Sequence, residues 1–401
     1  MIKHLCEMRR ASLQGDPMKF FSLILCLLLL IGCAPKETAP ETTAPATAAP
    51  PEATTETALP PGTTVPSDPI REIISGMSLQ ERVGQLFLAR CDGATAVEHV
   101  SQYQLGGFLL FGQDFENQTP DSFREKLASY QSAAKIPLLV AVDEEGGTVA
   151  RVSSNTAFRS QKFPSPRTAY SQGGMEGALL NEDEKCSLLA SLGINVNLGP
   201  VCDITTDPNA FMYQRSMGLS PEETSRFVSD TVAIMNAYRI GSALKHFPGY
   251  GNNADTHTGM AVDSRSLEEL EEYDLLPFAA GMGSGCGAIL VSHAIVEALD
   301  SSLPASLSPA VHTYLREKMG FDGVILTDDL VMQAITDQYG AGEAAVMAVL
   351  AGNDLLCSTD YVTQYEAVYA AVLDGRIDID VLNAAVRNVL EWKAALGLIA
   401  P

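Results

Sequence analysis

Eight short apolar runs alternate with segments of helical pattern along residues 68–401, and this alternation constrains the fold more than any other feature. The runs are 83–89, 105–111, 136–142, 195–201, 242–247, 288–292, 323–327 and 354–358. The amphipathic stretches between them include 177–191, 222–238, 309–319 and 343–351. Continuous apolar strands separated by helices indicate a parallel sheet that is covered on both faces. Eight such units predict a single α/β domain of the (β/α)8, or TIM-barrel, type. An open doubly wound sheet is the alternative, although no GxGxxG motif follows the first run.

Titratable residues follow five of these runs, at the point where each run ends. They are Asp143, Asp203, Lys245 with His246, His293, and Asp328 with Asp329. In barrels of this type, the carboxyl ends of the strands carry the catalytic groups. A helix cap explains one such residue, but five strands that end in this way predict an enzyme active site.

The choice between the two neighbouring aspartates stays open at this stage. Adjacent strand residues point to opposite faces, so only one of Asp328 and Asp329 faces the barrel centre. We expect the other to cap a helix that begins near Leu330. His293 either lines the site or is an ordinary packed histidine.

The segment 245–257, KHFPGYGNNADTH, gathers further ionisable groups in a loop rich in glycine and asparagine. Lys245 and His246 end the strand, and Asp255 and His257 follow on the loop. A structural loop has little use for these four side chains together, so the segment predicts catalysis. A zinc site built from His246, Asp255, His257 and Asp328 is an alternative, because such clusters can bind this metal.

Composition limits the partners. The formal charge of −23 argues against nucleic acids and anionic membrane surfaces, since both repel an acidic protein. The single Trp and 7% aromatic content favour a small pocket over a long polysaccharide groove if the ligand is a sugar. The odd number of cysteines after residue 68 argues against a full disulfide framework and favours buried free thiols. Trp392 and Phe247 are expected in the core.

The N-terminal region predicts an exported lipoprotein. Residues 18–33 combine a lysine, a short apolar core and a lipobox-like ending at Cys33, which we expect to be lipidated. A transmembrane anchor is the alternative, but the apolar run is short for a span. Residues 34–67, rich in Ala, Pro, Thr and Glu, predict an extended tether. Met18 is a plausible start, which leaves open whether residues 1–17 belong to the natural protein.

Several motifs together resemble glycoside hydrolase family 3, in its single-domain β-N-acetylglucosaminidase (β-hexosaminidase) branch. They are DEEGGTVAR at 143–151, the Arg215-Ser216 pair, KHFPGYG followed by DTH at 245–257, SHAIV at 292–296 and GFDGVILTDDL at 320–330. The resemblance spans residues 68–401. It implies a retaining exo-acting hydrolase of terminal N-acetylglucosamine that acts on peptidoglycan fragments (muropeptides). Together with the lipobox-like ending at Cys33, we expect this enzyme at the outer face of the bacterial cytoplasmic membrane. The resemblance implies no cofactor and no metal.

Carried over position by position, the resemblance makes Asp328 the nucleophile, His257 the general acid/base and Asp255 the residue that orients His257. A neutral imidazole suits proton transfer near neutral pH without repelling the nucleophile.

The resemblance assigns sugar binding to Asp143, Arg151, Arg215, Lys245 and His246. Carboxylates accept from sugar hydroxyls, and Lys and Arg donate to sugar oxygens. From the residues alone, Asp143 could instead be an interior ion-pair partner of Arg151 or Lys245.

The chain departs from the family pattern at Tyr250, where a second histidine is common, and at Thr148, where an arginine is usual. Both departures bear on fine substrate preference. A β-N-acetylglucosaminide phosphorylase and a β-glucosidase are alternative enzymes of the same fold. A solute-binding lipoprotein is the alternative that is not an enzyme.

Overall fold

The computed structural model describes residues 68–251, 253, 256 and 259–400. Asp255 and His257, the proposed acid/base pair, lie outside the described residues. The same holds for Cys33 and for the predicted leader and tether.

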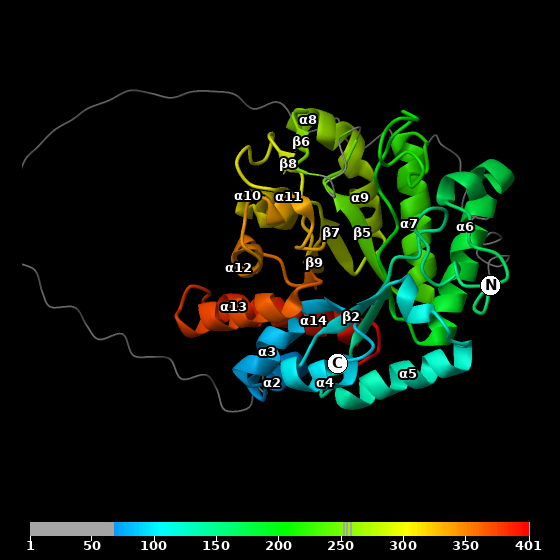
Figure 1. Ribbon diagram of the computed structural model, residues 1–401. Coiled ribbons are helices and arrows are strands. Elements are labelled where there is room, and N and C mark those ends of the chain that lie inside the picture. The colour runs from blue at the N-terminus through cyan, green and yellow to red at the C-terminus, as the bar shows by residue number, and fades with distance from the viewer. Residues whose placement is uncertain (1–67, 252, 254–255, 257–258, 401) are drawn as a thin grey trace, which may run out of the picture. The chain divides into compact units, whose positions relative to one another are not determined.

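The strands form one parallel sheet that curves into a barrel, as predicted (Figure 1). The strands are β1 (Phe87–Arg90), β2 (Gly107–Leu110), β3 (Leu139–Val142), β4 (Val196–Asn197), β5 (Gly241–Phe247), β7 (Ala288–Val291), β9 (Val324–Thr327) and β10 (Leu356–Ser358). Their order is β10-β1-β2-β3-β4-β5-β7-β9. A parallel bridge between Leu326 and Leu355 joins the two ends of this order. The prediction of a (β/α)8 barrel is therefore confirmed.

Helices surround the barrel and cover its outer face (Figure 1). The longer ones are α2 (Pro69–Ser75), α3 (Leu79–Gln85), α4 (Ala96–Tyr103), α5 (Pro120–Ala133), α6 (Pro166–Leu192), α7 (Pro221–Ala237), α9 (Leu275–Gly283), α12 (Ala341–Ala351), α13 (Tyr361–Leu373) and α14 (Ile379–Ala395). The short ones are η1 (Gly112–Phe115), α8 (Leu267–Glu269), η4 (Ala305–Leu307), α10 (Pro309–Thr313) and α11 (Gln333–Thr336). Two π-helical turns, η3 (Leu270–Asp274) and η5 (Tyr314–Lys318), continue α8 and α10.

A recurrent local signal starts many of these helices. In α5, α6, α7 and α10, a Ser or Thr hydroxyl accepts a backbone N–H of the first turn and a proline occupies the next position. The hydroxyl satisfies one of the N–H groups that a helix start leaves without a partner, and proline needs no such partner. The Ser-Pro or Thr-Pro pair therefore fixes the residue at which each of these four helices begins.

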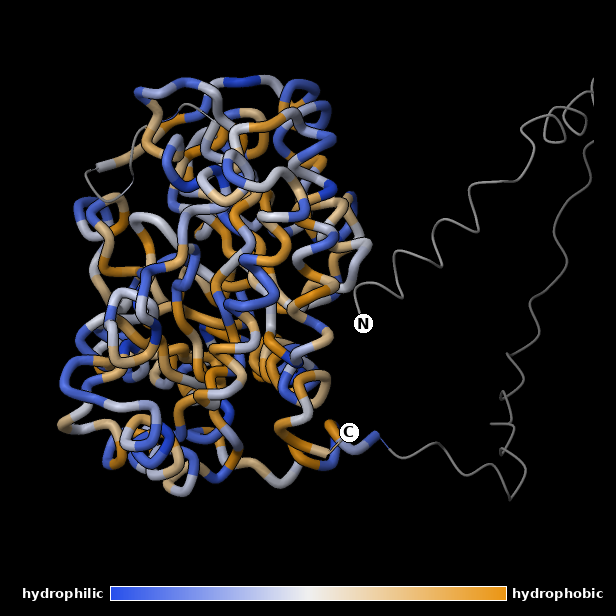
Figure 2. The backbone as a smooth tube through the Cα atoms, turned by 90° about the vertical axis from the view of Figure 1, so that its right-hand side faces the viewer, coloured by the Kyte–Doolittle hydropathy of each residue, from blue (hydrophilic) through white to orange (hydrophobic). Residues whose placement is uncertain are grey.

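The core has an inner and an outer part. Apolar side chains of the strands, such as Leu88, Leu139 and Leu326, fill the barrel interior with Trp392 of α14. A Cβ at Gly241 or Gly287 would lie 2.7 or 2.0 Å from the Trp392 ring, so these glycines allow the indole to pack against the starts of β5 and β7. Larger clusters fill the space between strands and helices. Apolar segments accordingly concentrate inside the domain and polar ones on its outer turns (Figure 2). Trp392 and Phe247 are core residues, as expected.

The structure differs from the sequence-based expectation in several places. Residues 83–85, expected in the first strand, belong to α3, because a capping box of Ser78 and Glu81 starts that helix at Leu79. The fourth strand ends at Asn197 and is shorter than expected, and its pairing with β5 continues only as an isolated bridge between Val201 and Lys245. A separate two-stranded sheet of β6 (Val262–Asp263) and β8 (Ile295–Val296) was not predicted.

The cysteine prediction is confirmed in the described part of the chain, where Cys91, Cys186, Cys202, Cys286 and Cys357 are free and buried. None of the helices in the described ranges combines the length and apolar character needed to cross a membrane.

Candidate active site

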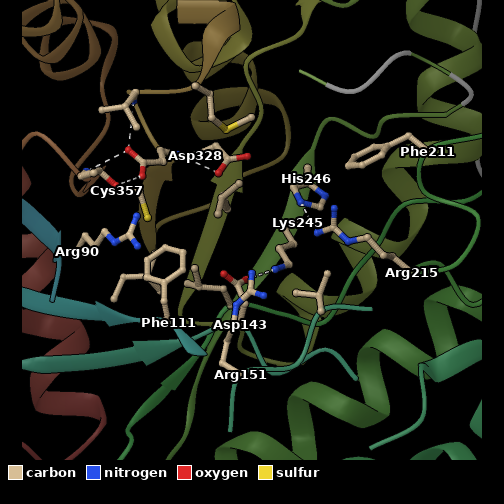
Figure 3. A pocket seen from close by; sticks show the side chains of 18 of the residues that line it. Arg90, Phe111, Asp143, Arg151, Phe211, Arg215, Lys245, His246, Asp328 and Cys357 are labelled. Carbon is tan, nitrogen blue, oxygen red and sulfur yellow. Dashed lines mark hydrogen bonds and ion pairs between the residues drawn. The ribbon is translucent and has the colours of Figure 1, made fainter. Parts of the chain in front are cut away.

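A pocket of about 870 Å³ opens where the barrel strands end at their carboxyl side (Figure 3). Every predicted sugar-binding or nucleophilic residue lines it: Asp143, Arg151, Arg215, Lys245, His246 and Asp328. They come from the ends of β3, β5 and β9 and from the loops after β3 and β4. The volume lies within the range of about 300–1,000 Å³ that is usual for small-molecule sites. The barrel therefore brings together residues that are far apart in the sequence.

Lys245 is the most enclosed charge of the pocket, with a side chain that is 2% exposed. Its Nζ lies 2.5 Å from Oδ1 of Asp143 and 2.7 Å from Oε1 of Glu145. Burial opposes the charge on Lys245, but the two carboxylates outweigh it and raise the pKa of the ammonium group. Asp143 is thus an ion-pair partner of Lys245 and still lines the pocket.

Glu145 joins Lys245 to Arg215. Arg215 donates to both carboxylate oxygens, from Nε at 2.9 Å and from Nη2 at 2.7 Å. Burial alone would favour the neutral acid, but Lys245 and Arg215 hold the pKa of Glu145 well below its usual range. In turn, Glu145 raises the pKa of Arg215 against the effect of burial. This buried carboxylate fixes two cationic sugar-binding candidates in place, a role that the sequence did not reveal.

His246 has a defined tautomer because of its two neighbours. Its Nδ1 lies 2.7 Å from Oδ2 of Asp203, and its Nε2 lies 3.1 Å from Nη2 of Arg215. A guanidinium group only donates hydrogen bonds, so Nε2 must accept and the proton must be on Nδ1. Asp203 accepts the hydrogen bond from Nδ1–H of His246, and it also accepts a hydrogen bond from the backbone N–H of Tyr250 at 2.7 Å. Asp203 therefore orients His246 and positions the loop that follows.

Tyr250 replaces the second histidine of the family pattern. Its ring is buried and packs edge-on against His246 and Phe211. Its hydroxyl hydrogen-bonds Oγ1 of Thr256. Tyr250 thus forms an apolar wall beside His246, while its polar end reaches the segment that bears the predicted acid/base pair.

Glu144 shapes the loop that presents Arg151. Its Oε2 accepts the backbone N–H of Arg151 and of Val152, each at 2.7 Å, and Oε1 accepts that of Ser153 at 3.3 Å. The side chain is buried beneath the loop. The guanidinium of Arg151 lies over the ring of Phe111, with Cζ 5.7 Å from its centroid.

Asp328 and Asp329 have different surroundings. Asp328 follows β9 and lines the pocket, and its Oδ1 accepts the backbone N–H of Asp329 at 2.9 Å. Asp329 also reaches the pocket, but its carboxylate accepts from the backbone and hydroxyl of Thr359 after β10. Burial raises the pKa of Asp329.

The expectation that one aspartate caps a helix near Leu330 was wrong. The next helix begins at Gln333 with Met332 at its N-cap, and Asp329 instead ties the end of β9 to the loop after β10. This cross-strand contact does not follow from local sequence.

His293 is a packed histidine. It is fully buried, its Nδ1 contacts Oγ of Ser306 at 2.7 Å, and its Nε2 contacts the carbonyl of Asp329 at 3.0 Å. It supports the end of β9 from behind the pocket.

Sequence reasoning missed three kinds of residue. Glu144 and Glu145 follow Asp143 directly, and three successive acids at a strand end could have indicated buried partners. Asp203 was noted only as a polar residue after a strand. Arg90 and Phe111, at the ends of β1 and β2, line the pocket without having carried any motif signal.

No metal centre emerges from the described residues, where no group of three or more His, Cys, Asp or Glu side chains could hold an ion. Both nitrogens of His246 face other side chains, and Asp255 and His257 of the zinc alternative lie outside the described part. The pocket presents the carboxylate of Asp328 opposite a set of fixed donors and acceptors, and such a set suits a polyhydroxylated ligand.

Known proteins are similar to this chain over much of its length. The model for the glycosyl hydrolase family 3 N terminal domain matches residues 78–392. A β-hexosaminidase of Xylella fastidiosa is 30% identical over 311 residues, covering 76% of this chain and 91% of the relative. β-Hexosaminidase A of Pseudoalteromonas piscicida is 33% identical over 276 residues, covering 64% of this chain and 46% of the relative.

A solved structure shares the fold. The family 3 β-N-acetylglucosaminidase of Paenibacillus sp. superposes with a TM-score of 0.76 at 31% identity, over 81% of this chain and 64% of that one. This chain thus spans about half of the Pseudoalteromonas relative and under two thirds of the Paenibacillus protein. The family model spans most of the chain and the barrel fold agrees with it, so the chain belongs to glycoside hydrolase family 3.

Proposed function

We propose that this protein is a retaining exo-β-N-acetylglucosaminidase that hydrolyses terminal, non-reducing, β-linked N-acetylglucosamine. One observation carries the proposal: Asp328 opens into the same pocket as Asp143, Arg215, Lys245 and His246. The Xylella and Pseudoalteromonas relatives are named β-hexosaminidases, which supports this choice of sugar.

Binding uses the fixed polar groups of the pocket. Lys245 and Arg215 are held by buried carboxylates, so they reach a sugar without the entropy loss of ordering free side chains. Asp143 accepts hydrogen bonds from sugar hydroxyls. His246 carries its proton on Nδ1, so its Nε2 side faces the pocket as a hydrogen-bond acceptor. This arrangement orients the anomeric carbon toward Asp328.

The chemistry follows two steps. Asp328 attacks the anomeric carbon while His257 donates a proton to the leaving oxygen, which yields a glycosyl-enzyme. His257 then accepts a proton from the water that attacks this intermediate, and Asp255 orients the imidazole. An Asp-His pair here replaces the second carboxylate of the usual retaining scheme. The roles of Asp255 and His257 rest on the family resemblance.

The first test compares nitrophenol release from the aryl β-N-acetylglucosaminide and the aryl β-glucoside. We expect the N-acetyl substrate to be preferred and Asp328→Asn to lower its kcat by at least about a thousandfold, because the nucleophile is lost. Asp322→Asn is the matched control, since Asp322 is exposed and precedes β9 at its opposite end. Preference for the glucoside would favour a β-glucosidase, and absence of any turnover would favour a solute-binding lipoprotein.

The second test concerns the acid/base. His257→Ala should slow substrates with poor leaving groups far more than activated aryl glycosides, because only the former need a proton on the leaving oxygen. An equal loss on both would exclude His257 as the acid.

Phosphorolysis is a competing outcome at the same site. A histidine acid/base repels an anionic acceptor less than a carboxylate would, so phosphate could intercept the glycosyl-enzyme. Product analysis with and without phosphate decides: a sugar 1-phosphate would identify a phosphorylase, and free N-acetylglucosamine alone a hydrolase.

The natural substrate and the location are further parts of the proposal. Peptidoglycan fragments with a terminal N-acetylglucosamine fit the resemblance, and lipidation of Cys33 would hold the enzyme at the outer face of the cytoplasmic membrane. Labelled palmitate should be incorporated into the full chain and not into the Cys33→Ser variant. Incorporation into both would refute lipidation at this residue.

A further inference from the structure

Tyr250 lies between two pairs of residues to which the proposed function gives different tasks. Lys245 and His246 are the sugar-binding pair at the end of β5, and Asp255 and His257 are the acid/base pair. Tyr250 follows the first pair and precedes the second in the chain, and it lines the pocket. The proposed function itself gives Tyr250 no task.

The ring of Tyr250 is held by its surroundings. Tyr250 is 3% exposed, and its ring centroid lies 5.3 Å from that of His246 and 5.8 Å from that of Phe211. These two partners lie on the same side of the pocket as Arg215 (Figure 3). The backbone N–H of Tyr250 donates to Oδ1 of Asp203 at 2.7 Å. Because the same carboxylate holds His246, the position of Tyr250 is tied to the end of β5.

The far end of Tyr250 holds the chain that follows it. Its hydroxyl hydrogen-bonds Oγ1 of Thr256, which is fully buried. A buried hydroxyl without a partner is unfavourable, so each of these two groups favours keeping the other in place. The carbonyl of Tyr250 also accepts the backbone N–H of Asn253 at 3.0 Å. Tyr250 therefore contacts the following segment at two points, Asn253 and Thr256.

Thr256 separates the two residues of the proposed acid/base pair. Asp255 precedes it and His257 follows it directly in the sequence. Consecutive Cα atoms are only about 3.8 Å apart, so a hydrogen bond that fixes Thr256 restricts the positions open to both neighbours. General acid catalysis requires the proton donor within hydrogen-bond reach of the leaving oxygen. A displacement of about 1 Å can lower the rate by roughly a hundredfold.

We propose that Tyr250 is a positioning residue for the general acid. Its hydroxyl, acting through Oγ1 of Thr256, places His257 for proton transfer to the leaving oxygen. Its ring packs against His246, so one side chain connects the sugar-binding group to the proton donor. Tyr250 transfers no proton itself. This inference rests on the proposed function, in which His257 is the acid, and adds to it the residue that sets the position of that acid.

Tyr250→Phe tests the proposal, because it removes the hydroxyl and keeps the ring. The assay compares kcat/KM for diacetylchitobiose, whose leaving sugar needs a proton, with kcat/KM for the dinitrophenyl β-N-acetylglucosaminide, whose leaving group does not. We expect Tyr250→Phe to lower the first value by about tenfold or more and the second by less than about twofold. The ratio of the two values is formed within each variant, so a lower fraction of folded enzyme cancels.

Thr256 provides a second test from the other end of the hydrogen bond. Thr256→Val should change the ratio as Tyr250→Phe does, whereas Thr256→Ser keeps the hydroxyl and should retain most of the wild-type ratio. The double variant Tyr250→Phe/Thr256→Val should differ little from either single variant, because both substitutions remove the same hydrogen bond. Effects that multiply in the double variant would show that the two side chains act independently and would overturn the proposal.

Tyr314→Phe is the matched control. It removes a hydroxyl that donates to Oε1 of Glu271 at 2.7 Å, and neither residue lines the pocket. This variant should keep the wild-type ratio. A Tyr314→Phe ratio that changes as much as that of Tyr250→Phe would refute a specific role of Tyr250.

His257→Ala, measured in the same assay, separates failure of this inference from failure of the proposed function. If His257→Ala changes the ratio and Tyr250→Phe leaves it at the wild-type value, the proposed acid stands and the positioning role of Tyr250 is refuted. If His257→Ala leaves the ratio unchanged, the assignment of the acid fails, and the role of Tyr250 fails with it. Absence of turnover by the wild-type protein refutes both.

Discussion

Replacing Asp203 by asparagine is expected to disable sugar binding through His246 without removing any group that touches the sugar. Asp203 is buried, and its Oδ2 accepts from the backbone N–H of His246 at 3.1 Å and from Nδ1 at 2.7 Å. Its Oδ1 accepts from the backbone N–H of Tyr250 at 2.7 Å. The carboxylate thus serves three donors with two acceptor oxygens.

An amide cannot do the same. If the oxygen of the new amide faces His246, its NH2 group faces the N–H of Tyr250, and two donors meet. If the NH2 group faces His246, the imidazole proton must move to Nε2, where Arg215 already donates. Losing a hydrogen bond to a charged group costs about 1.5–3 kcal/mol. A loss of about 2–3 kcal/mol lowers kcat/KM by roughly 30- to 150-fold.

The assay is steady-state hydrolysis of the aryl N-acetylglucosaminide, with thermal unfolding to verify that the variant is folded. If His246 contacts the sugar both before and during reaction, as we propose, KM should rise along with the fall in kcat/KM. Asp374→Asn, at an exposed position after α13, is the control. A folded Asp203→Asn variant whose kcat/KM stays within about threefold of wild type would refute the tautomer argument.

Three other predictions follow from the structure. Lys393 is fully buried against Gln85, and burial lowers its pKa from 10.5 to about 7. Between about pH 7 and pH 10.5 the lysine is therefore protonated in the unfolded chain and neutral in the folded one. The free energy of unfolding should accordingly rise with pH across this window. Lys393→Met should therefore stabilise the protein by a few kcal/mol near pH 6, with the gain declining toward pH 10; urea titrations that show the same gain at both pH values would contradict this. Arg265 forms ion pairs with Asp263 and Asp274 and donates to the Gly249 carbonyl at 3.3 Å, shortly before the segment that bears His257. Arg265→Gln should therefore slow the hydrolysis of substrates with poor leaving groups more than that of activated aryl glycosides. Arg265→Lys should have a smaller effect of the same kind. Exhaustive chelation should leave the rate of hydrolysis unchanged, because the two ring nitrogens of His246 already contact Asp203 and Arg215. A loss of activity that added zinc restores would show a metal site instead.

Much of the fold was predictable because its signals are local. Continuous apolar runs, Ser-Pro and Thr-Pro helix starts and polar residues at strand ends are each read within a few residues, and together they indicated a barrel with its site at the strand ends. The exact length of the fourth strand was not predictable from its apolar run, because the run continues to Val201 while the regular strand ends at Asn197. The roles of Glu145 and Asp203 escaped prediction because their partners lie far away in the sequence, on β5 and on the loop after β4.

The sequence by itself determined the (β/α)8 architecture, the strand ends that carry chemistry, and the residues available for it. Only the tertiary structure decided which of those residues meet. The spacing in the sequence could not show which of Asp328 and Asp329 faces the pocket as a nucleophile. In the structure, Asp329 accepts a hydrogen bond from Thr359 on the neighbouring loop and so has a structural contact. Likewise, Arg90 and Arg151 meet at one phenylalanine only because β1 and β3 lie on either side of β2, which Phe111 follows. Apolar periodicity acts along the chain, but charge pairing depends on distances across the barrel, which the sequence does not contain.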